Sequence, residues 1–219
     1  SDSKRSYFPA VDDEEIQIVY LRAQEIGRYV GEGVLDAGIT GFDWIQESAC
    51  DVTEICELPY SKATSNPARW VLAVPNESKV ARAEDLDGGI VATELVDVTK
   101  RYFEQKGVRV RVEFSWGATE VKARLVDAIV ELTETGTSLR ANNLRIVDTV
   151  IVSTTRFIAN NNAWQDPFKR EKIENLTILL RAAIAARGMV GLKMNVRKDD
   201  LASVLHVLPA EKSPTVSAL

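Results

Sequence analysis

The stretch from Asp127 to Asn142, which reads DAIVELTETGTSLRAN, constrains this 219-residue chain more than any other segment. Residues 127–132 form a short apolar run with β-branched side chains, which predicts a buried strand. A turn of glycine and hydroxyl residues follows, and a helical pattern begins after it. Such a strand–turn–helix unit presents backbone N–H groups and the positive end of a helix to an anion. We therefore predict a phosphate-binding loop formed by Thr135, Gly136, Thr137, Ser138 and Leu139, in which Gly136 lets the backbone approach the ligand closely.

Acidic side chains flank the predicted loop. Glu131 and Glu134 precede the turn, and Asp127 begins the strand. Because carboxylates repel a phosphate, we expect these acids to bind sugar hydroxyls or Mg²⁺. Phosphoribosyl pyrophosphate, with a sugar diol on one side and a 5′-phosphate on the other, suits this order of residues. The alternative is an ordinary strand–turn–helix connection that happens to contain a glycine, and the motif alone leaves both open.

Composition narrows the class of protein. The chain is 45% hydrophobic and 27% charged, which is typical of a globular protein. It has no run of 18 apolar residues and no secretory pattern, so we expect a cytoplasmic protein without a membrane anchor. A net charge of −5 argues against a nucleic-acid binder. The spacing of Cys50 and Cys56 matches no common zinc or redox motif, so free thiols are favoured over a disulfide, and the lone His206 excludes a His-rich metal centre.

Strand and helix patterns alternate through the first three quarters of the chain. Strands are expected over residues 16–21, 35–40, 69–74, 89–94, 109–114, 127–132 and 146–153, and helices over 23–32, 42–47 and 98–106. This alternation predicts an α/β fold with parallel sheets, helices on both faces and ligands beyond the carboxyl ends of the strands. Crossings at Pro75–Asp85 and Leu144–Asp148 predict two hinged lobes around a cleft. The first lobe would comprise residues 1–74 and 147–165, and the second residues 75–146.

A third unit is predicted over residues 166–219. Asp166 and Pro167 are typical of a helix start, and Gly188 of a helix end. Alternating apolar residues from Val190 to Val196 predict a strand, and a further helix is expected over residues 201–208. These elements form part of a ferredoxin-like α+β domain, incomplete because a single strand needs partners.

A series of stretches, in the same order, resembles one enzyme family. They are RSYFPAVDDEEI, YLRAQEI, DAGITGFDW, WVLAVP, VATE, EFSWGATEVK, DAIVELTETGTSLRANNLRI, STTRFIAN and KSPTVS. On these residues the chain is similar to ATP phosphoribosyltransferase in its long form, over nearly its whole length. The resemblance implies a two-lobed, periplasmic-binding-protein-like catalytic part followed by an ACT-like regulatory domain.

The resemblance also implies a reaction. A 5-phosphoribosyl group would pass from phosphoribosyl pyrophosphate to N1 of ATP with Mg²⁺ as cofactor, which is the first step of histidine biosynthesis. Asp127, Glu131 and Glu134 match the acidic side of the family's sugar site, with Glu131 a possible Mg²⁺ ligand, and residues 135–139 match its phosphate loop. Arg22 and Asp43 match its nucleotide site. Without the family match, an ordinary ion pair between Arg22 and Asp43 would be favoured.

Regulation and assembly are implied in the same way. Asn195 and Thr215 match positions that bind histidine as a feedback effector, with Asn195 where some members have Asp. The family suggests homo-oligomers, as dimers and hexamers. The chain departs from the family at Gly27, Glu131 and Ser138, where Pro, Asp and Thr are common, and we expect it to lack the family's first strand and helix.

Two further expectations concern the cleft. The tryptophans are expected to pack in the core, although the loop that carries Trp116 and Gly117 is placed to line the cleft. The rival function is a non-catalytic solute-binding protein of the same two-lobed class, which would share the hinge but would not need acids beside the loop.

Overall fold

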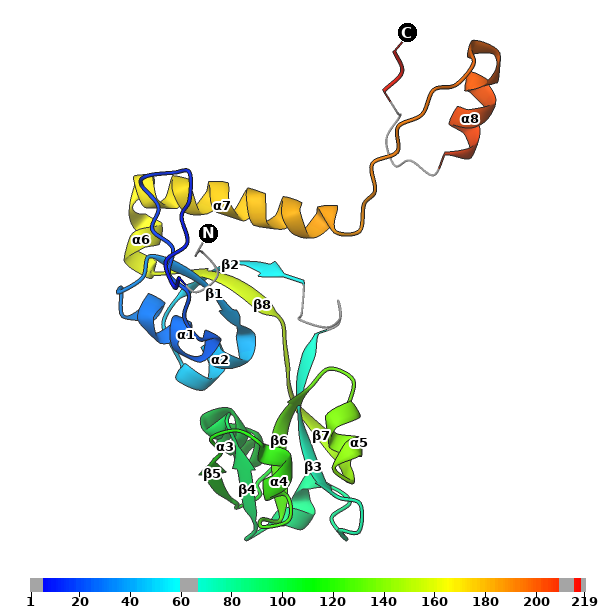
Figure 1. Ribbon diagram of the computed structural model, residues 1–219. Helices are drawn as coiled ribbons and strands as arrows, with labels where there is room; N and C mark the ends of the chain where they lie inside the picture. Colours follow the sequence, from blue (N-terminus) through cyan, green and yellow to red (C-terminus); the bar gives the residue numbers. More distant parts are fainter. Residues whose placement is uncertain (1–5, 60–66, 209–214, 218–219) are drawn as a thin grey trace. The chain divides into compact units, whose positions relative to one another are not determined.

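The computed structural model describes residues 6–59, 67–208 and 215–217 of the chain (Figure 1). It divides into two compact units, Ser1–Ile184 and Ala185–Leu219. The first unit contains two β-sheets, and we call each sheet with its helices a lobe. The α/β class and the helices on both faces of the sheets agree with the sequence prediction.

The first lobe is built on a three-stranded antiparallel sheet. Its central strand β8 (Thr155–Ala159) pairs with β1 (Ala37–Gly41) and with β2 (Thr53–Leu58). One face carries α1 (Ala23–Gly31) and α2 (Phe42–Ser48), and the other carries α6 (Asn161–Gln165) and α7 (Pro167–Ala186). Side chains of β8 alternate accordingly: Ile158 packs with the α1 and α2 side, whereas Phe157 packs with Ile173 of α7.

Residues 6–22, the described part of the segment before α1, form no strand, contrary to the expectation for residues 16–21. Its backbone instead makes isolated bonds, such as the one from the amide of Tyr20 to the carbonyl of Tyr7 at 2.8 Å. Lys172 of α7 holds the segment through Asp13 and Glu15, at 2.6 and 2.7 Å. An apolar run becomes a strand only where a partner strand supplies the ladder of hydrogen bonds.

The second lobe is built on a five-stranded mixed sheet in the order β5-β4-β6-β3-β7. The strands are β3 (Ala68–Pro75), β4 (Ile90–Thr93), β5 (Arg111–Phe114), β6 (Ala128–Thr133) and β7 (Leu144–Ser153). β5, β4 and β6 run parallel, while β3 runs antiparallel to both β6 and β7. The helical elements are η2 (Ala83–Leu86), α3 (Val96–Gln105), α4 (Thr119–Lys122) and α5 (Thr137–Ala141). Trp70 and Leu72 of β3 face a core with Phe103 of α3, and Val71 faces a second core with Leu139 of α5.

Strand pairing corrects two features of the sequence prediction. Only β5, β4 and β6 form the expected parallel sheet, and β2 and β8 were not predicted as strands. Residues 68–74 and 147–153, assigned above to the first lobe, pair in the sheet of the second. Apolar runs predict where strands lie, but partner and direction depend on contacts distant in sequence.

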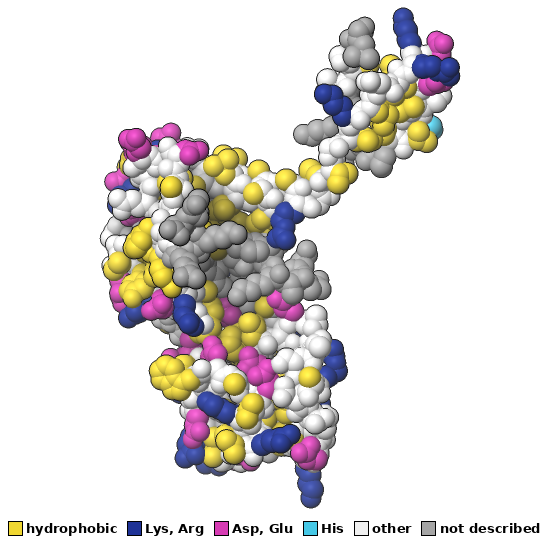
Figure 2. Space-filling view, in the orientation of Figure 1, with side chains coloured by type: hydrophobic (Ala, Val, Ile, Leu, Met, Phe, Trp, Pro, Cys, Tyr) yellow, Lys and Arg dark blue, Asp and Glu magenta, His cyan; other side chains and the backbone are white. Residues whose placement is uncertain are grey.

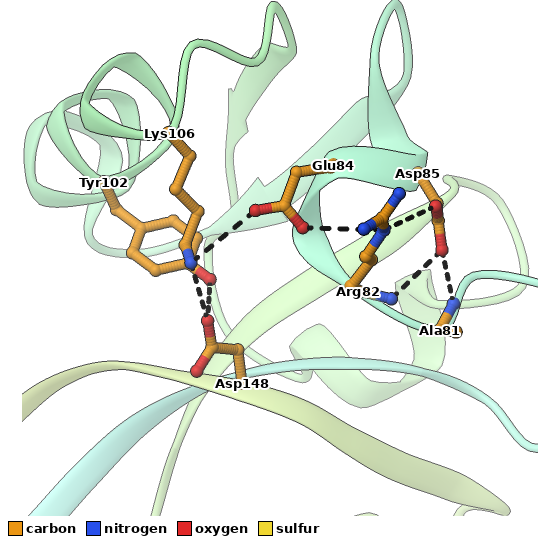
Figure 3. Close-up of polar contacts among 7 residues, drawn as sticks. All are labelled: Ala81, Arg82, Glu84, Asp85, Tyr102, Lys106 and Asp148. Carbon is orange, nitrogen blue, oxygen red and sulfur yellow. Dashed lines mark hydrogen bonds and ion pairs between the residues drawn. The ribbon is translucent and has the colours of Figure 1, made fainter.

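Edge strand β7 is irregular and is fixed to α3. Its register against β3 shifts twice, on either side of the Asp148–Thr149 pair of residues. The carboxylate of Asp148 accepts a 2.5 Å hydrogen bond from the Tyr102 hydroxyl and lies 3.1 Å from Nζ of Lys106 (Figure 3). Tyr102 belongs to α3 and Lys106 is the C-cap residue of that helix, and Glu84 of η2 lies 4.0 Å from the Lys106 ammonium group. The helix thus holds the strand where its ladder is broken.

The lobes also contact each other through α2 and α3. Glu47 of α2 accepts from the amides of Asp97 and Val98 at 3.0 and 2.9 Å, and so caps the first turn of α3. The guanidinium of Arg101 donates to the carbonyl oxygen of Gln46 at 2.5 Å. The predicted crossing at Pro75–Asp85 is wrong, because these residues lie within the second lobe, after β3.

The second unit contains η3 (Lys198–Asp200) and α8 (Leu201–Val207), which confirms the last predicted helix. Residues 190–196 form no strand, and Val190 and Leu192 are largely exposed. The unit begins at Ala185 rather than at Asp166, because Ile173 is buried in the core of the first lobe.

Candidate functional site

The predicted loop joins β6 to α5, as expected. Gly136 lies between them with φ +73°, a conformation that favours glycine. Its amide donates to Oγ1 of Thr133 at 2.7 Å, and the hydroxyls of Thr135 and Thr137 are 2.9 Å apart. The Gly136 amide hydrogen therefore fixes the loop instead of pointing at a ligand, and sequence reasoning missed Thr133, the residue that holds it.

Other donors remain for an oxyanion. The amide of Arg140 donates to the carbonyl of Gly136 at 3.1 Å, the first bond of a helix. The amides of the preceding residues, Thr137 to Leu139, have no intrahelical acceptor at such a helix start. Leu139 contributes only its amide, since its side chain is 1% exposed. A hollow of about 360 Å³ borders the loop and is lined by Asn76, Gly136, Leu139, Arg140, Leu144, Arg145 and Ile146.

Three glutamates meet beside the loop. Burial raises the pKa of Glu131, although hydrogen bonds from the Thr119 hydroxyl and the Leu132 amide oppose that shift. The negative charges of Glu120 and Glu94 raise the pKa further. The hydroxyl of Ser138 donates to Oε1 of Glu120, which links α4 to the predicted loop. The site is therefore an acidic cluster joined to a hydroxyl-rich loop.

Glu94 and Glu120 were not among the predicted site residues. Glu94 follows β4, and Glu120 lies in α4 after β5. The motif VATE places Glu94 directly after β4, and this position is a signal that could have found it, whereas Glu120 of SWGATE lies further from β5, within α4.

The predicted acids differ in position. Glu131 lies near the carboxyl end of β6, and Glu134 follows that strand directly, in the loop. Asp127 does not join them, because it precedes β6 and lies at the opposite end of that strand. Its Oδ2 accepts from the amide of Ile90 at 2.8 Å, and its amide donates to the carbonyl of Ile90 at 3.0 Å. Asp127 thus ties the starts of β4 and β6 together, which corrects its assignment to the sugar site.

The predicted nucleotide pair is not brought together. Asp43 is 4% exposed, and its two carboxylate oxygens accept from Trp70 at 2.6 Å and from Ser153 at 2.7 Å. Asp43 therefore has a structural role between α2, β3 and β7, and its predicted contact with ATP stays a prediction. Arg22 is exposed and borders a hollow of about 490 Å³ with Tyr7, Phe8, Val19, Tyr20, Leu21 and Glu25. Its role in ATP binding stays a prediction.

The effector residues stay predictions too. Asn195 and Thr215 are both exposed and lie in the second unit.

The donor set fits Mg²⁺ only if substrate supplies further ligands. No group of three or more His, Cys, Asp or Glu side chains in the described ranges could hold a metal ion by itself. Mg²⁺ commonly takes one or two carboxylates together with substrate phosphates, and Glu131 and Glu120 meet that need. Cys50 and Cys56 are free thiols, as predicted. No helix within the described ranges is long and apolar enough to cross a membrane.

Comparison with known proteins decides the family. A family model for ATP phosphoribosyltransferase matches residues 22–182, and a model for the C-terminal domain of HisG matches residues 186–219. The chain belongs to the ATP phosphoribosyltransferase family. It is therefore a transferase, and the boundary between the two family models falls beside Ala185, where the second unit begins.

Curated relatives agree over the whole chain. ATP phosphoribosyltransferase of Koribacter versatilis is 59% identical over 218 residues, which cover 99% of this chain and 75% of the relative. The protein of the same name from Desulforudis audaxviator is 58% identical over 218 residues, and that from Chlorobium chlorochromatii is 55% identical over 220, each again with 75% of the relative covered.

Two solved structures share the fold of this chain. The ATP phosphoribosyl transferase (HisG:HisZ) complex from Thermotoga maritima matches with a TM-score of 0.69 and 30% identity, over 80% of this chain and 82% of that one. The periplasmic aliphatic sulphonate binding protein SsuA from Escherichia coli matches with a TM-score of 0.52 at 16% identity, over 75% of this chain and 60% of that one. The second likeness shows the fold alone, and it confirms the predicted resemblance to periplasmic binding proteins.

Proposed function

We propose that this protein transfers a 5-phosphoribosyl group from phosphoribosyl pyrophosphate to N1 of ATP and releases pyrophosphate. This is the first step of histidine biosynthesis. The observation that supports it most is the acidic cluster beside a hydroxyl-rich loop, at the carboxyl edge of β4 and β6, in a chain of this family.

The loop and the cluster serve different parts of the donor. The 5′-phosphate lies against the amides of Thr137 to Leu139 and the hydroxyls of Thr135 and Thr137, which compensate its charge as the start of a helix does. The ribose hydroxyls donate to Glu131 and Glu134. A desolvated carboxylate such as Glu131 forms strong charge-assisted hydrogen bonds, because little water competes for it.

The same carboxylates act on the reacting carbon. As pyrophosphate departs, positive charge develops at C1′, and fixed negative charge nearby stabilises that state more than the ground state. No protein nucleophile is needed, because the site aligns the acceptor nitrogen, C1′ and the leaving oxygen. Bound Mg²⁺, held by Glu131 and Glu120, would neutralise charge on the leaving pyrophosphate.

Regulation and assembly complete the proposal. Histidine binds the second unit through Asn195 and Thr215 and inhibits the enzyme, and the protein forms dimers and hexamers. The family model for the second unit supports a separate domain with its own task. An Asn at position 195 cannot pair with the ammonium group of histidine as an Asp would, so inhibition is expected to be weak.

An ultraviolet assay for phosphoribosyl-ATP tests the reaction. The purified protein should form this product from ATP, phosphoribosyl pyrophosphate and Mg²⁺, and Glu131→Ala should lower kcat by about 10²-fold or more, the usual scale for one electrostatic contact. A protein that forms no product but binds an amino acid or a sulfonate in calorimetry would instead be a solute-binding protein.

A further inference from the structure

Trp116 is exposed to a degree that is unusual for a tryptophan. Its side chain is 91% exposed, whereas Trp70 is 2% exposed. The ring of Phe114, itself half exposed, meets the indole edge-on, with ring centroids 4.8 Å apart and an interplanar angle of 81°. The Phe114 ring thus packs against the indole and leaves an indole face open to a ligand.

The backbone beneath the indole is firmly held. Ser115 is fully buried, and its amide donates to the carbonyl of Thr93 at 2.8 Å. Its hydroxyl lies 2.9 Å from Oγ1 of Thr119, which is also buried. Gly117 follows with φ +105°, which only glycine adopts readily, and turns the chain into α4. The indole therefore stands on an anchored turn and not on a loose loop.

The turn adjoins the proposed active site. Thr119, which anchors Ser115, also hydrogen-bonds Glu131. A Cβ added at Gly117 would lie 3.9 Å from Oε1 of Glu94. Figure 2 shows hydrophobic and acidic side chains side by side along one edge of the second lobe. The indole and the carboxylates thus share the edge of the sheet where the loop holds the donor.

The charge of this edge determines what can face the indole. Glu94, Glu120 and Glu131 repel a triphosphate, so a nucleotide that approaches here must turn its phosphates away. Its base is then the part that meets the aromatic surface. The proposed reaction requires the acceptor base next to C1′ of the donor, which is beside Glu131.

We propose that the open face of Trp116 stacks against the purine base of the acceptor nucleotide and holds it for attack on the donor. This inference rests on the proposed function and names the residue that positions the acceptor. Stacking of a base on an aromatic side chain contributes ~1–3 kcal/mol, which corresponds to roughly 5- to 150-fold in affinity.

Steady-state kinetics test the proposal. In Trp116→Ala the KM for ATP should rise roughly 5- to 150-fold, while the KM for phosphoribosyl pyrophosphate stays within about twofold. Trp116→Phe should keep most of the wild-type affinity for ATP. The matched control is Leu125→Ala, which removes another exposed apolar side chain of the second lobe, 80% exposed, and should change neither KM.

Other outcomes overturn the stacking role. An unchanged KM for ATP in Trp116→Ala would overturn it. A loss of oligomer mass in light scattering, together with equal shifts in both KM values, would also overturn it, because the indole would then be covered by a second copy of the chain. If the wild type forms no product, the proposed function fails. Calorimetry with ATP alone then judges Trp116: binding lost only in Trp116→Ala supports stacking, whereas equal binding in both proteins, or none in the wild type, refutes it.

Discussion

The indole N–H of Trp70 donates a 2.6 Å hydrogen bond to Oδ2 of Asp43 and so joins β3 to α2. The Ser153 hydroxyl donates to Oδ1 at 2.7 Å and accepts from the Asp43 amide at 3.1 Å. Because Ser153 ends β7, one buried carboxylate fixes both long strands of the second lobe to a helix of the first. Gly41 leaves the space for it, since a Cβ there would lie 2.0 Å from Oδ1.

Replacing Asp43 by Ala should destabilise the protein. The change leaves the Trp70 indole and the Ser153 hydroxyl without their acceptor, at a cost of about 1–3 kcal/mol for each buried group. Urea unfolding of Asp43→Ala measures the loss, and Asp51→Ala, at an exposed carboxylate nearby, is the control. Equal stability of the two variants would show that the hydrogen bonds to Asp43 do not stabilise the contact between the lobes. An Asp43→Asn variant that keeps its stability but loses ATP binding would restore the predicted nucleotide contact.

Gly136 and Gly88 offer a matched test of the phosphate loop. Both have positive φ, +73° and +81°, but a Cβ at Gly136 would lie 3.0 Å from Nη1 of Arg140, whereas one at Gly88 meets nothing within 4 Å. Alanine at either position should cost about 1–3 kcal/mol of stability from backbone strain. Only Gly136→Ala should raise the KM for phosphoribosyl pyrophosphate, by about tenfold, or about 1.4 kcal/mol. Equal KM values for phosphoribosyl pyrophosphate in the two variants would show that the loop does not bind the donor.

The turn between β6 and α5 could be predicted from sequence because its signals are local. Residues 135–138 carry their own turn signal, and the strand before them and the helix after them follow at once in the chain. The helices α1, α3, α7 and α8 were likewise found, since helical periodicity depends on near neighbours alone.

What the sequence did not predict depends on distant contacts. Glu94 and Glu120 lie near Glu131 because β4 pairs in parallel with both β6 and β5, and although an acid after a strand is a local signal, no local pattern encodes those pairings. Asp127 was misplaced because an acid before a strand and an acid after it look alike until the sheet assigns them to opposite edges. The burial of Asp43 was not predicted, because a charged side chain is rarely buried unless it has partners, and its partners Trp70 and Ser153 lie far along the chain.

The raised pKa of Glu131 predicts that its charge lowers stability while it supports activity. A carboxyl whose pKa is raised by folding binds more protons in the folded state than in the unfolded state. Stability therefore falls as the pH rises from the ordinary pKa of 4.5 through the higher pKa of the folded state. Glu131→Gln should therefore be more stable than the wild type at pH 7, and this advantage should vanish below about pH 4.5, where both forms of the wild type are protonated. Its phosphoribosyl transfer should be slower. Thermal unfolding across pH checks the sign, with Glu113→Gln, at an exposed acid of β5, as the control. A pH-independent difference would show that the charge of Glu131 is not the cause.

Tyr102→Phe should weaken the contact between α3 and β7. The hydrogen bond from the Tyr102 hydroxyl, then the neighbouring Lys106, lower the pKa of Asp148, whereas burial of the phenol raises the pKa of Tyr102. A hydrogen bond to a charged group contributes about 1.5–3 kcal/mol, and partial exposure of this one favours the lower figure. The loss should be full at pH 7 and should shrink as pH falls below 3.8, because protonation of Asp148 weakens the bond in the wild type as well. Tyr29→Phe is the control, since its hydroxyl makes no hydrogen bond within the described part of the chain. If urea unfolding shows the same small loss of stability for both variants at pH 7, the sheet alone stabilises the irregular part of β7. The hydrogen bond from Tyr102 to Asp148 then adds nothing to it.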